Sequence, residues 1–243
     1  MTEAACLLPR VFERSTPPFV TAPIAGLAVC KDLLHSADAR CLVQSLVDRG
    51  CPVVRLSKAA FLEIAHAPEP QGVLLALHQN WQVLPQKVNR RDLWLGVENI
   101  RTPGNLGTLL RSAQAAGATG VMVFGPPRDR ADPWDPGCVR ASMGSLFAMK
   151  VVQTNHQAFR KWHGRYEMRI LGADGGASTD YRKVSFRKPT LVMLGEERKG
   201  LSEAQRATCD AFVKIPMCPG VDSLNIAMAG TLLLYQALGQ RGS

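Results

Sequence analysis

Three short polar segments carry the side chains that could take part in a reaction. Each segment lies where an apolar run ends or begins. The first segment offers an amide and a guanidinium, the second a carboxylate, and the third a hydroxyl and an amide: Asn105, Arg111, Glu197, Ser223 and Asn225. Groups of these types can hold phosphate, donate hydrogen bonds to charge that develops on oxygen, or assist the loss of a proton.

The segment from residue 191 to residue 239 is expected to position the second and third groups. Residues Leu191–Leu194 predict a buried strand that breaks at Gly195 into a short charged loop, and a glycine there permits close backbone approach to a ligand. A second predicted strand, Ala211–Ile215, leads through a Pro-Gly turn to the polar start of a helix over Leu224–Leu238. This helix is apolar on nearly every side, which predicts that it is sandwiched. Two loops at strand ends and one helix start therefore converge.

Simpler structural roles could also account for these polar residues. Asn105 is a favourable helix N-cap and Arg111 could be a solvated helix residue. Because positions six apart fall on different faces of a regular helix, periodicity does not bring these two side chains together. The charged loop after Gly195 could be a surface turn, and capping by Asp222 or Ser223 could explain the last segment.

Composition restricts the class of protein. The chain has 243 residues, of which 46% are apolar, and its net charge is +9. This charge suits a polyanionic partner without requiring one. The seven cysteines include no C-x-x-C pair, which is typical of reduced thiols in a cytoplasmic protein, and the five histidines show no metal-ligand spacing. No apolar run approaches the length of a membrane span, so we expect a soluble protein without a membrane partner.

The order of predicted elements divides the chain into a leader, two domains and a linker. Residues 1–23 have no hydrophobic period and contain several prolines, so we expect a poorly ordered leader. Residues 24–78 predict a small α/β domain and the polar residues 79–91 a linker. From 92 to 243, very apolar strands separated by helices predict an α/β fold with a parallel sheet covered on both faces. Ligands of such sheets bind beyond the carboxyl ends of the strands.

Several short sequences resemble the motifs of a known enzyme family. They are Pro103 to Gly107 with Arg111, then Gly195-Glu196-Glu197 with Gly200-Leu201-Ser202, then Ile215-Pro216-Met217, and finally Ser223-Leu224-Asn225. In this order they are similar to the three motifs of SpoU-type (TrmH-like) RNA ribose 2'-O-methyltransferases, of the SPOUT superfamily. The resemblance is close over residues 92–238. Residues 26–77 more loosely resemble the RNA-binding domain that many members carry, although its first strand and helix are missing or replaced here.

The resemblance implies a deep C-terminal trefoil knot, S-adenosylmethionine as cofactor, an RNA substrate and a homodimer. The implied cofactor-binding residues, which act largely through main-chain groups, are Leu194, Gly195, Glu196, Ile215, Met217 and Leu224. The implied catalytic residues are Asn105, Arg111, Glu197, Ser223 and Asn225, and no metal is expected. Arginine is nearly always charged and is a poor base, so Arg111 is better suited to holding a phosphate and stabilising charge on the ribose oxygen. Glu196 and Arg198 depart from the residues usual at their positions in the family.

Ribosomal RNA is the expected substrate, because the auxiliary domain accompanies rRNA-directed members more often than tRNA-directed ones. Transfer RNA is the alternative substrate. Two other functions stay open at this point: a catalytically silent RNA-binding or ribosome-assembly factor with the same fold, and methylation of a base. Weaker candidates for RNA contact are Arg140, Ser142 and Ser145, and the basic runs 125–130 and 181–188.

Overall fold

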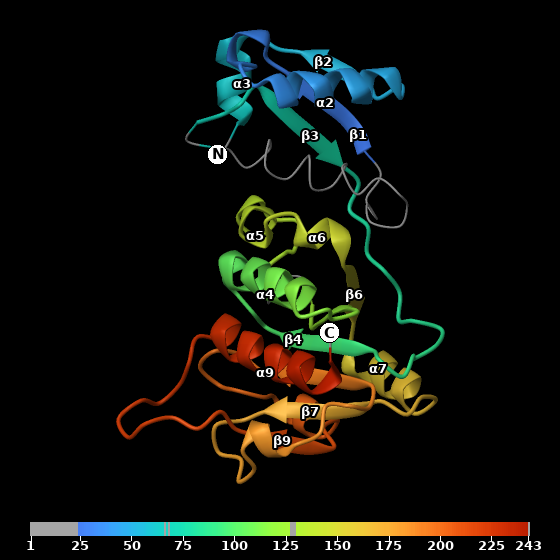
Figure 1. Cartoon of the computed structure of the whole chain (residues 1–243), viewed down its shortest axis with the longest axis vertical. Helices are drawn as coiled ribbons and strands as arrows, with labels where there is room; N and C mark the ends of the chain where they lie inside the picture. Colours follow the sequence, from blue (N-terminus) through green and yellow to red (C-terminus); the bar gives the residue numbers. More distant parts are fainter. Residues whose placement is uncertain (1–23, 66, 68, 127–129, 243) are drawn as a thin grey trace. The chain divides into compact units, whose positions relative to one another are not determined.

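The computed structural model describes residues 24–242, except residues 66, 68 and 127–129. The predicted leader, residues 1–23, therefore lies outside the described residues, as does part of the basic run 125–130. The chain divides into two compact units, residues 1–80 and residues 81–243. Figure 1 shows the elements of each unit.

In its described residues, the first unit contains a three-stranded sheet with two α-helices. Its strands are β1 (Ile24–Val29), β2 (Val53–Arg55) and β3 (Val73–Leu77), in the order β2-β1-β3, with β2 parallel and β3 antiparallel to β1. Its helices are α2 (Ala37–Asp48) and α3 (Lys58–Ile64), with a short 3-10 helix η1 (Lys31–Leu33). The core consists of Leu27, Val29, Ala39, Leu46 and Val73.

The second unit is built on a six-stranded sheet in which every pair of neighbours is parallel, in the order β6-β5-β4-β8-β7-β9. The strands are β4 (Leu93–Glu98), β5 (Gly120–Phe124), β6 (Lys150–Thr154), β7 (Arg169–Ala173), β8 (Thr190–Leu194) and β9 (Ala211–Val213). The helices are α4 (Pro103–Ala115), α5 (Pro136–Ser142), α6 (Ser145–Ala148), α7 (His156–His163), α8 (Glu203–Arg206) and α9 (Ile226–Arg241), with the 3-10 helix η3 (Tyr181–Lys183).

Burial of the central strands explains why they are so apolar. Every residue of β4, β5 and β8 is buried, as expected for strands with both faces covered. Helix α9 packs against α4 and β8, and Figure 1 shows α9 running beside α4. The predicted α/β class with a parallel sheet is confirmed.

Two helices begin at different residues from those that the local pattern predicted. Helix α4 begins at Pro103, whose ring favours the first helical position, so Asn105 lies in the first turn and is not the N-cap. Helix α9 begins at Ile226, because the Asn225 side-chain oxygen accepts a hydrogen bond from the Ala227 amide at 2.9 Å. Capping by Asp222 or Ser223 is therefore wrong.

Most of the segment expected as a linker, residues 79–91, belongs to the second unit and is bonded to its elements. Gln82 forms a parallel bridge with Val152 of β6. The indole of Trp162 donates to the carbonyl of Pro85 at 2.6 Å, and the Tyr166 hydroxyl donates to the carbonyl of Gln86. Gln82 thus lies on the edge of the sheet at β6, and Pro85 and Gln86 lie beside α7 and Tyr166, which follows it. No helix of the described residues is long and apolar enough to cross a bilayer.

Candidate functional site

A pocket lies at the carboxyl ends of β7, β8 and β9, the edge where parallel sheets bind ligands. It encloses about 170 Å³. Four segments form its walls: the end of β7, the loop after β8, the end of β9 with the residues that follow it, and the start of α9. The lining residues are Ala173, Asp174, Gly175, Leu194, Gly195, Glu196, Glu197, Gly200, Val213, Ile215, Met217, Asp222, Ser223, Leu224, Ile226 and Ala229.

The fold brings most of the sequence-predicted residues to this pocket. All six residues expected to bind a cofactor line it: Leu194, Gly195, Glu196, Ile215, Met217 and Leu224. Two of the five expected catalytic residues, Glu197 and Ser223, line it as well.

A chain of hydrogen bonds joins Asn105 and Asn225 to the pocket. The Asn105 side-chain amide donates to the Glu197 carboxylate at 3.0 Å. The Asn225 amide donates to the Asn105 side-chain oxygen at 3.1 Å. Residues from the three polar segments of the sequence therefore meet in one network, and Asn105 connects the other two.

Arg111 is the expected site residue that a single chain does not bring to the pocket. It is exposed on α4 and is not among the lining residues. Among the residues that the structure describes, no hydrogen bond or ion pair involves its side chain. The hydroxyl of the adjacent Ser112 accepts a hydrogen bond from Thr231 of α9 at 2.7 Å. The turn of α4 that carries Arg111 thus lies against α9.

The loop of residues 195–201, called the β8 loop below, requires a glycine at its first position. A Cβ atom at Gly195 would lie 2.1 Å from the carbonyl carbon and oxygen of Gly200. Glu196 and Gly200 exchange two backbone hydrogen bonds of 2.9 Å, which hold the two ends of the loop together. The sequence suggested a glycine that admits a ligand, but its closest neighbour is the backbone of its own loop.

Main-chain groups on the opposite walls are available to a ligand. Within the described part of the chain, the main-chain N–H and C=O groups of Ile215, Met217 and Leu224 take part in no backbone–backbone hydrogen bond. The main chain of Glu196, in contrast, is occupied by Gly200. Since polar backbone groups need partners, the free groups at Ile215 and Leu224 suit a bound molecule with donors and acceptors.

The pocket is acidic. Among the described residues, its lining includes four carboxylates, Asp174, Glu196, Glu197 and Asp222, and no Lys, Arg or His. Asp174 pairs with Arg206 at 2.7 Å, and this hydrogen bond holds the pKa of Asp174 below its ordinary value. Among the described residues the other three form no ion pair. Their charges favour a cationic ligand.

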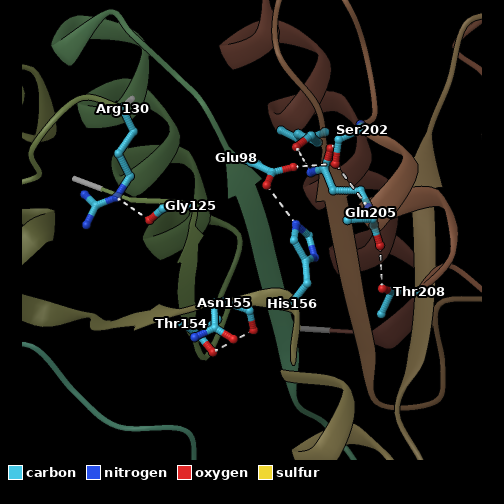
Figure 2. A network of polar contacts seen from close by, with 11 residues as sticks. Glu98, Gly125, Arg130, Thr154, Asn155, His156, Ser202, Gln205 and Thr208 are labelled. Carbon is cyan, nitrogen blue, oxygen red and sulfur yellow. Dashed lines mark hydrogen bonds and ion pairs between the residues drawn. The ribbon is translucent and has the colours of Figure 1, made fainter. Parts of the chain in front are cut away.

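A second polar network, which the sequence analysis missed, lies next to the β8 loop (Figure 2). Glu98 accepts a hydrogen bond from the Ser202 hydroxyl at 2.6 Å, and its other oxygen lies 2.7 Å from His156 Nε2. Burial would raise the pKa of Glu98, but the hydrogen bonds from His156 and Ser202 together lower it below its ordinary value. Ser202 and Gln205 form a capping box, and the sequence signal S-x-x-Q could have revealed that part.

Two of the weaker candidates for RNA contact are not accessible. Ser142 is fully buried and Ser145 is 3% exposed. Ser142 is the last residue of α5 and Ser145 the first of α6, and both helices pack against α4. Arg140 is half-buried. In the described part of the chain, no three or more His, Cys, Asp or Glu side chains are grouped as metal ligands.

Comparison with known proteins identifies the family. The model of the SpoU rRNA Methylase family matches residues 92–235, which is more than half of the chain. A 23S rRNA (uridine(2479)-2'-O)-methyltransferase of Streptomyces viridochromogenes is 39% identical over 160 residues, which cover 62% of this chain and 54% of that protein. The chain thus spans only about half the length of that relative. A 23S rRNA (guanosine-2'-O-)-methyltransferase of Vibrio parahaemolyticus is 26% identical over 200 residues and 79% of each chain.

The fold agrees with that of a solved relative. The SpoU methyltransferase AviRb from Streptomyces viridochromogenes, in complex with the cofactor AdoMet, superimposes with a TM-score of 0.82 at 30% sequence identity. The alignment covers 90% of this chain and 84% of AviRb. On the match of sequence and of fold, the chain belongs to the SpoU rRNA methylase family.

Proposed function

We propose that this protein transfers a methyl group from S-adenosylmethionine to the 2'-hydroxyl of an RNA ribose. The observation that carries the proposal is the acidic pocket at the carboxyl ends of β7, β8 and β9, which is walled by the segments that resemble the family motifs. Family membership supports the same reaction.

The residues of the pocket fit this cofactor. When bound, S-adenosylmethionine supplies an electrophilic methyl group on a positively charged sulfur. Glu196, Glu197 and Asp222 give the pocket the opposite charge. The free main-chain groups of Ile215 and Leu224 can pair with polar atoms of the ligand, and apolar side chains such as Leu194 and Ile226 can cover its rings.

The acidic lining predicts a preference for the charged cofactor over its neutral product. Replacing Glu196→Gln should weaken binding of S-adenosylmethionine by about threefold to tenfold and leave S-adenosylhomocysteine nearly unchanged, because only the former carries the sulfonium charge. Calorimetry with both ligands measures the two dissociation constants. Glu203→Gln, at an exposed position outside the pocket, is the matched control. Equal weakening of both ligands by Glu196→Gln would contradict the electrostatic role.

The polar residues around the pocket have distinct proposed roles. A ribose hydroxyl must lose its proton as it attacks, and charge then grows on its oxygen. Arg111 would hold a neighbouring phosphate through its guanidinium and stabilise that charge. Asn105, Asn225 and Glu197 would orient the sugar through the hydrogen-bond network that joins them. Ser223 would contact the substrate from the start of α9.

A homodimer is the proposed assembly, and one side of α9 supports it. Met228, Leu232 and Tyr235 follow the spacing of one helix face and are 58%, 39% and 49% exposed. The sequence pattern, apolar on nearly every side, predicted a sandwiched helix, so a second copy would cover this apolar face. Because Arg111 lies on the turn of α4 that contacts α9, the dimer would also place it near a pocket. Sedimentation that gives the mass of one chain at micromolar concentration would contradict the dimer.

The resemblance of the sequence to the family adds two further features to the proposal. Helix α9 would thread a loop to form the deep trefoil knot, and residues 24–78 would bind RNA. The site of action would be the cytoplasm, where ribosomal RNA is available.

The substrate is proposed to be ribosomal RNA, as the names of the relatives favour. Mass-spectrometric mapping of ribose methylation in total RNA, with and without the gene, tests this. Loss of one 2'-O-methyl group from rRNA is the expected result. Loss from tRNA would favour the alternative substrate, and loss of a base methyl group would favour a different reaction. No loss, together with no binding of S-adenosylmethionine in calorimetry, would indicate a silent RNA-binding factor.

A further inference from the structure

We propose that Glu98 is a positioning residue for the methyl-donor pocket: through Ser202 and Gln205 it fixes the β8 loop that forms one wall. The inference rests on the proposed function, because it assigns a cofactor-binding role to that loop. It concerns a carboxylate that lies outside the pocket lining and outside the catalytic residues named above.

Glu98 is a buried carboxylate with both oxygens in use. It is the last residue of β4 and is 8% exposed. One oxygen accepts from the Ser202 hydroxyl at 2.6 Å, and the other lies 2.7 Å from His156 Nε2. A carboxylate can accept on both sides, whereas an amide would turn an N–H group toward one partner. Burying a carboxylate costs free energy unless its oxygens accept hydrogen bonds. Loss of either partner would therefore be unfavourable, which holds the side chain in this geometry.

His156 holds the carboxylate from the side opposite to Ser202. Its ring stacks on Phe124 at a centroid distance of 5.1 Å, at the end of β5. Glu98 therefore ties together three adjacent regions: the end of β4, the start of α7 and the end of the β8 loop. Figure 2 shows Glu98 between His156 and Ser202.

From Ser202 the network continues to the pocket wall. The Ser202 hydroxyl accepts a hydrogen bond from the backbone N–H of Gln205 at 3.2 Å. The backbone N–H of Ser202 donates in return to the side-chain oxygen of Gln205 at 2.9 Å. The Gln205 side chain is fully buried and donates to the Leu194 carbonyl at 2.8 Å. Leu194 lines the pocket. One buried glutamine thus links the residue before the β8 loop to the residue after it.

The β8 loop is consequently fixed at its base and exposed at its tip. Leu194 and Ser202 are held by Gln205 and Glu98, and Glu196 is bonded to Gly200. Residues 197–199 are exposed. Without the hydroxyl bond to Glu98, the Ser202 end of the loop loses its side-chain connection to β4, while Leu194 stays paired with Val97 in the sheet. The pocket wall would then sample other positions, and part of the binding free energy would be spent on ordering it.

Ser202 variants of the full chain test the proposal. Ser202→Ala removes the link, and the dissociation constant of S-adenosylmethionine should rise by about tenfold in calorimetry. Ser202→Thr keeps the hydroxyl and should stay within about twofold of wild type. Ser57→Ala is the matched control, because Ser57 also caps a helix but lies in the first unit, and it should leave binding unchanged.

Two further readouts separate positioning from general stability. The KM for S-adenosylmethionine should rise in Ser202→Ala while kcat at saturating donor stays within about twofold, because the donor then orders the loop. Hydrogen exchange of residues 195–201 should also become faster in the free protein and return toward wild type when donor is bound.

Glu98→Leu decides the question if Ser202→Ala does not fold. It keeps a side chain of similar size, removes both acceptor oxygens, and should raise the same dissociation constant and the same exchange rates. Wild-type affinity in folded Ser202→Ala or in folded Glu98→Leu would overturn the proposal, as would an equal loss in Ser57→Ala. Failure of the wild-type protein itself to bind the donor would instead count against the proposed function.

Discussion

Replacing Arg111→Ala is expected to lower kcat/KM for RNA methylation by about 100-fold to 1000-fold, the range found when one stabilising donor is removed from an active site. Arg111→Lys should lose nearly as much, because a lysine ammonium cannot reproduce the planar fork that binds phosphate through two bonds. Binding of S-adenosylmethionine should not change, since Arg111 does not line the pocket of its own chain and its proposed contact is with an RNA phosphate. Methyl transfer to RNA and calorimetry with the cofactor measure the two effects separately.

A second exposed arginine, on another helix, distinguishes this role from a general loss of positive charge. Arg160 is exposed on α7 and does not line the pocket, so Arg160→Ala should keep nearly full activity. Near-normal turnover in Arg111→Lys would show that only the charge matters. A loss of cofactor affinity in either Arg111 variant would contradict the proposed separation of roles.

The sequence alone could predict the segments that form the pocket walls, because strands and their ends follow from local patterns of apolar and polar residues. Apolar runs predicted the strands, and their polar ends lie at the carboxyl edge of a parallel sheet. The order of motifs then selected Gly195, Ile215 and Leu224, and all three line the pocket. Main-chain recognition depends on where strands end, and strand ends are encoded locally.

The connections between segments could not be predicted in the same way. Asn105 satisfies the pattern of an N-cap, yet its partners are 92 and 120 residues away, at Glu197 and Asn225. Glu98 and Ser202 are separated by 104 residues. No period or spacing in the sequence encodes such pairs, since they depend on β8 lying beside β4 in the sheet.

Helix α9 shows a different limit. Its composition predicted burial on nearly every side, and Leu233, Leu234 and Ala237 are fully buried. Met228 and Tyr235 are about half exposed in the single chain. An apolar helix face indicates burial away from water, but it does not indicate which other part of the protein covers that face. The sequence therefore could not separate burial within one chain from burial between two.

Replacing Gly195→Ala should have the largest effect on the cofactor pocket. The added Cβ would lie 2.1 Å from the backbone carbon and oxygen of Gly200, so the β8 loop would have to move. Overpacking of this kind costs about 1–3 kcal/mol. The contact is with backbone, which cannot rotate away, so we expect the upper end of that range. About 3 kcal/mol corresponds to a rise of about 100-fold in the dissociation constant of S-adenosylmethionine, which calorimetry can measure.

Gly164→Ala is the matched control, because it adds the same methyl group at an exposed residue whose nearest neighbour, the Arg160 carbonyl oxygen, would lie at an ordinary contact distance of 3.5 Å. Gly164 follows α7, is not among the pocket-lining residues and has a helical φ of −61°, so alanine there should leave the fold and cofactor binding unchanged. If Gly195→Ala binds the cofactor as wild type does, then the Gly195–Gly200 contact does not set the pocket wall. If it binds weakly but its thermal stability equals that of wild type, the strain is confined to the β8 loop, because the loop can rearrange without disturbing the sheet beneath it.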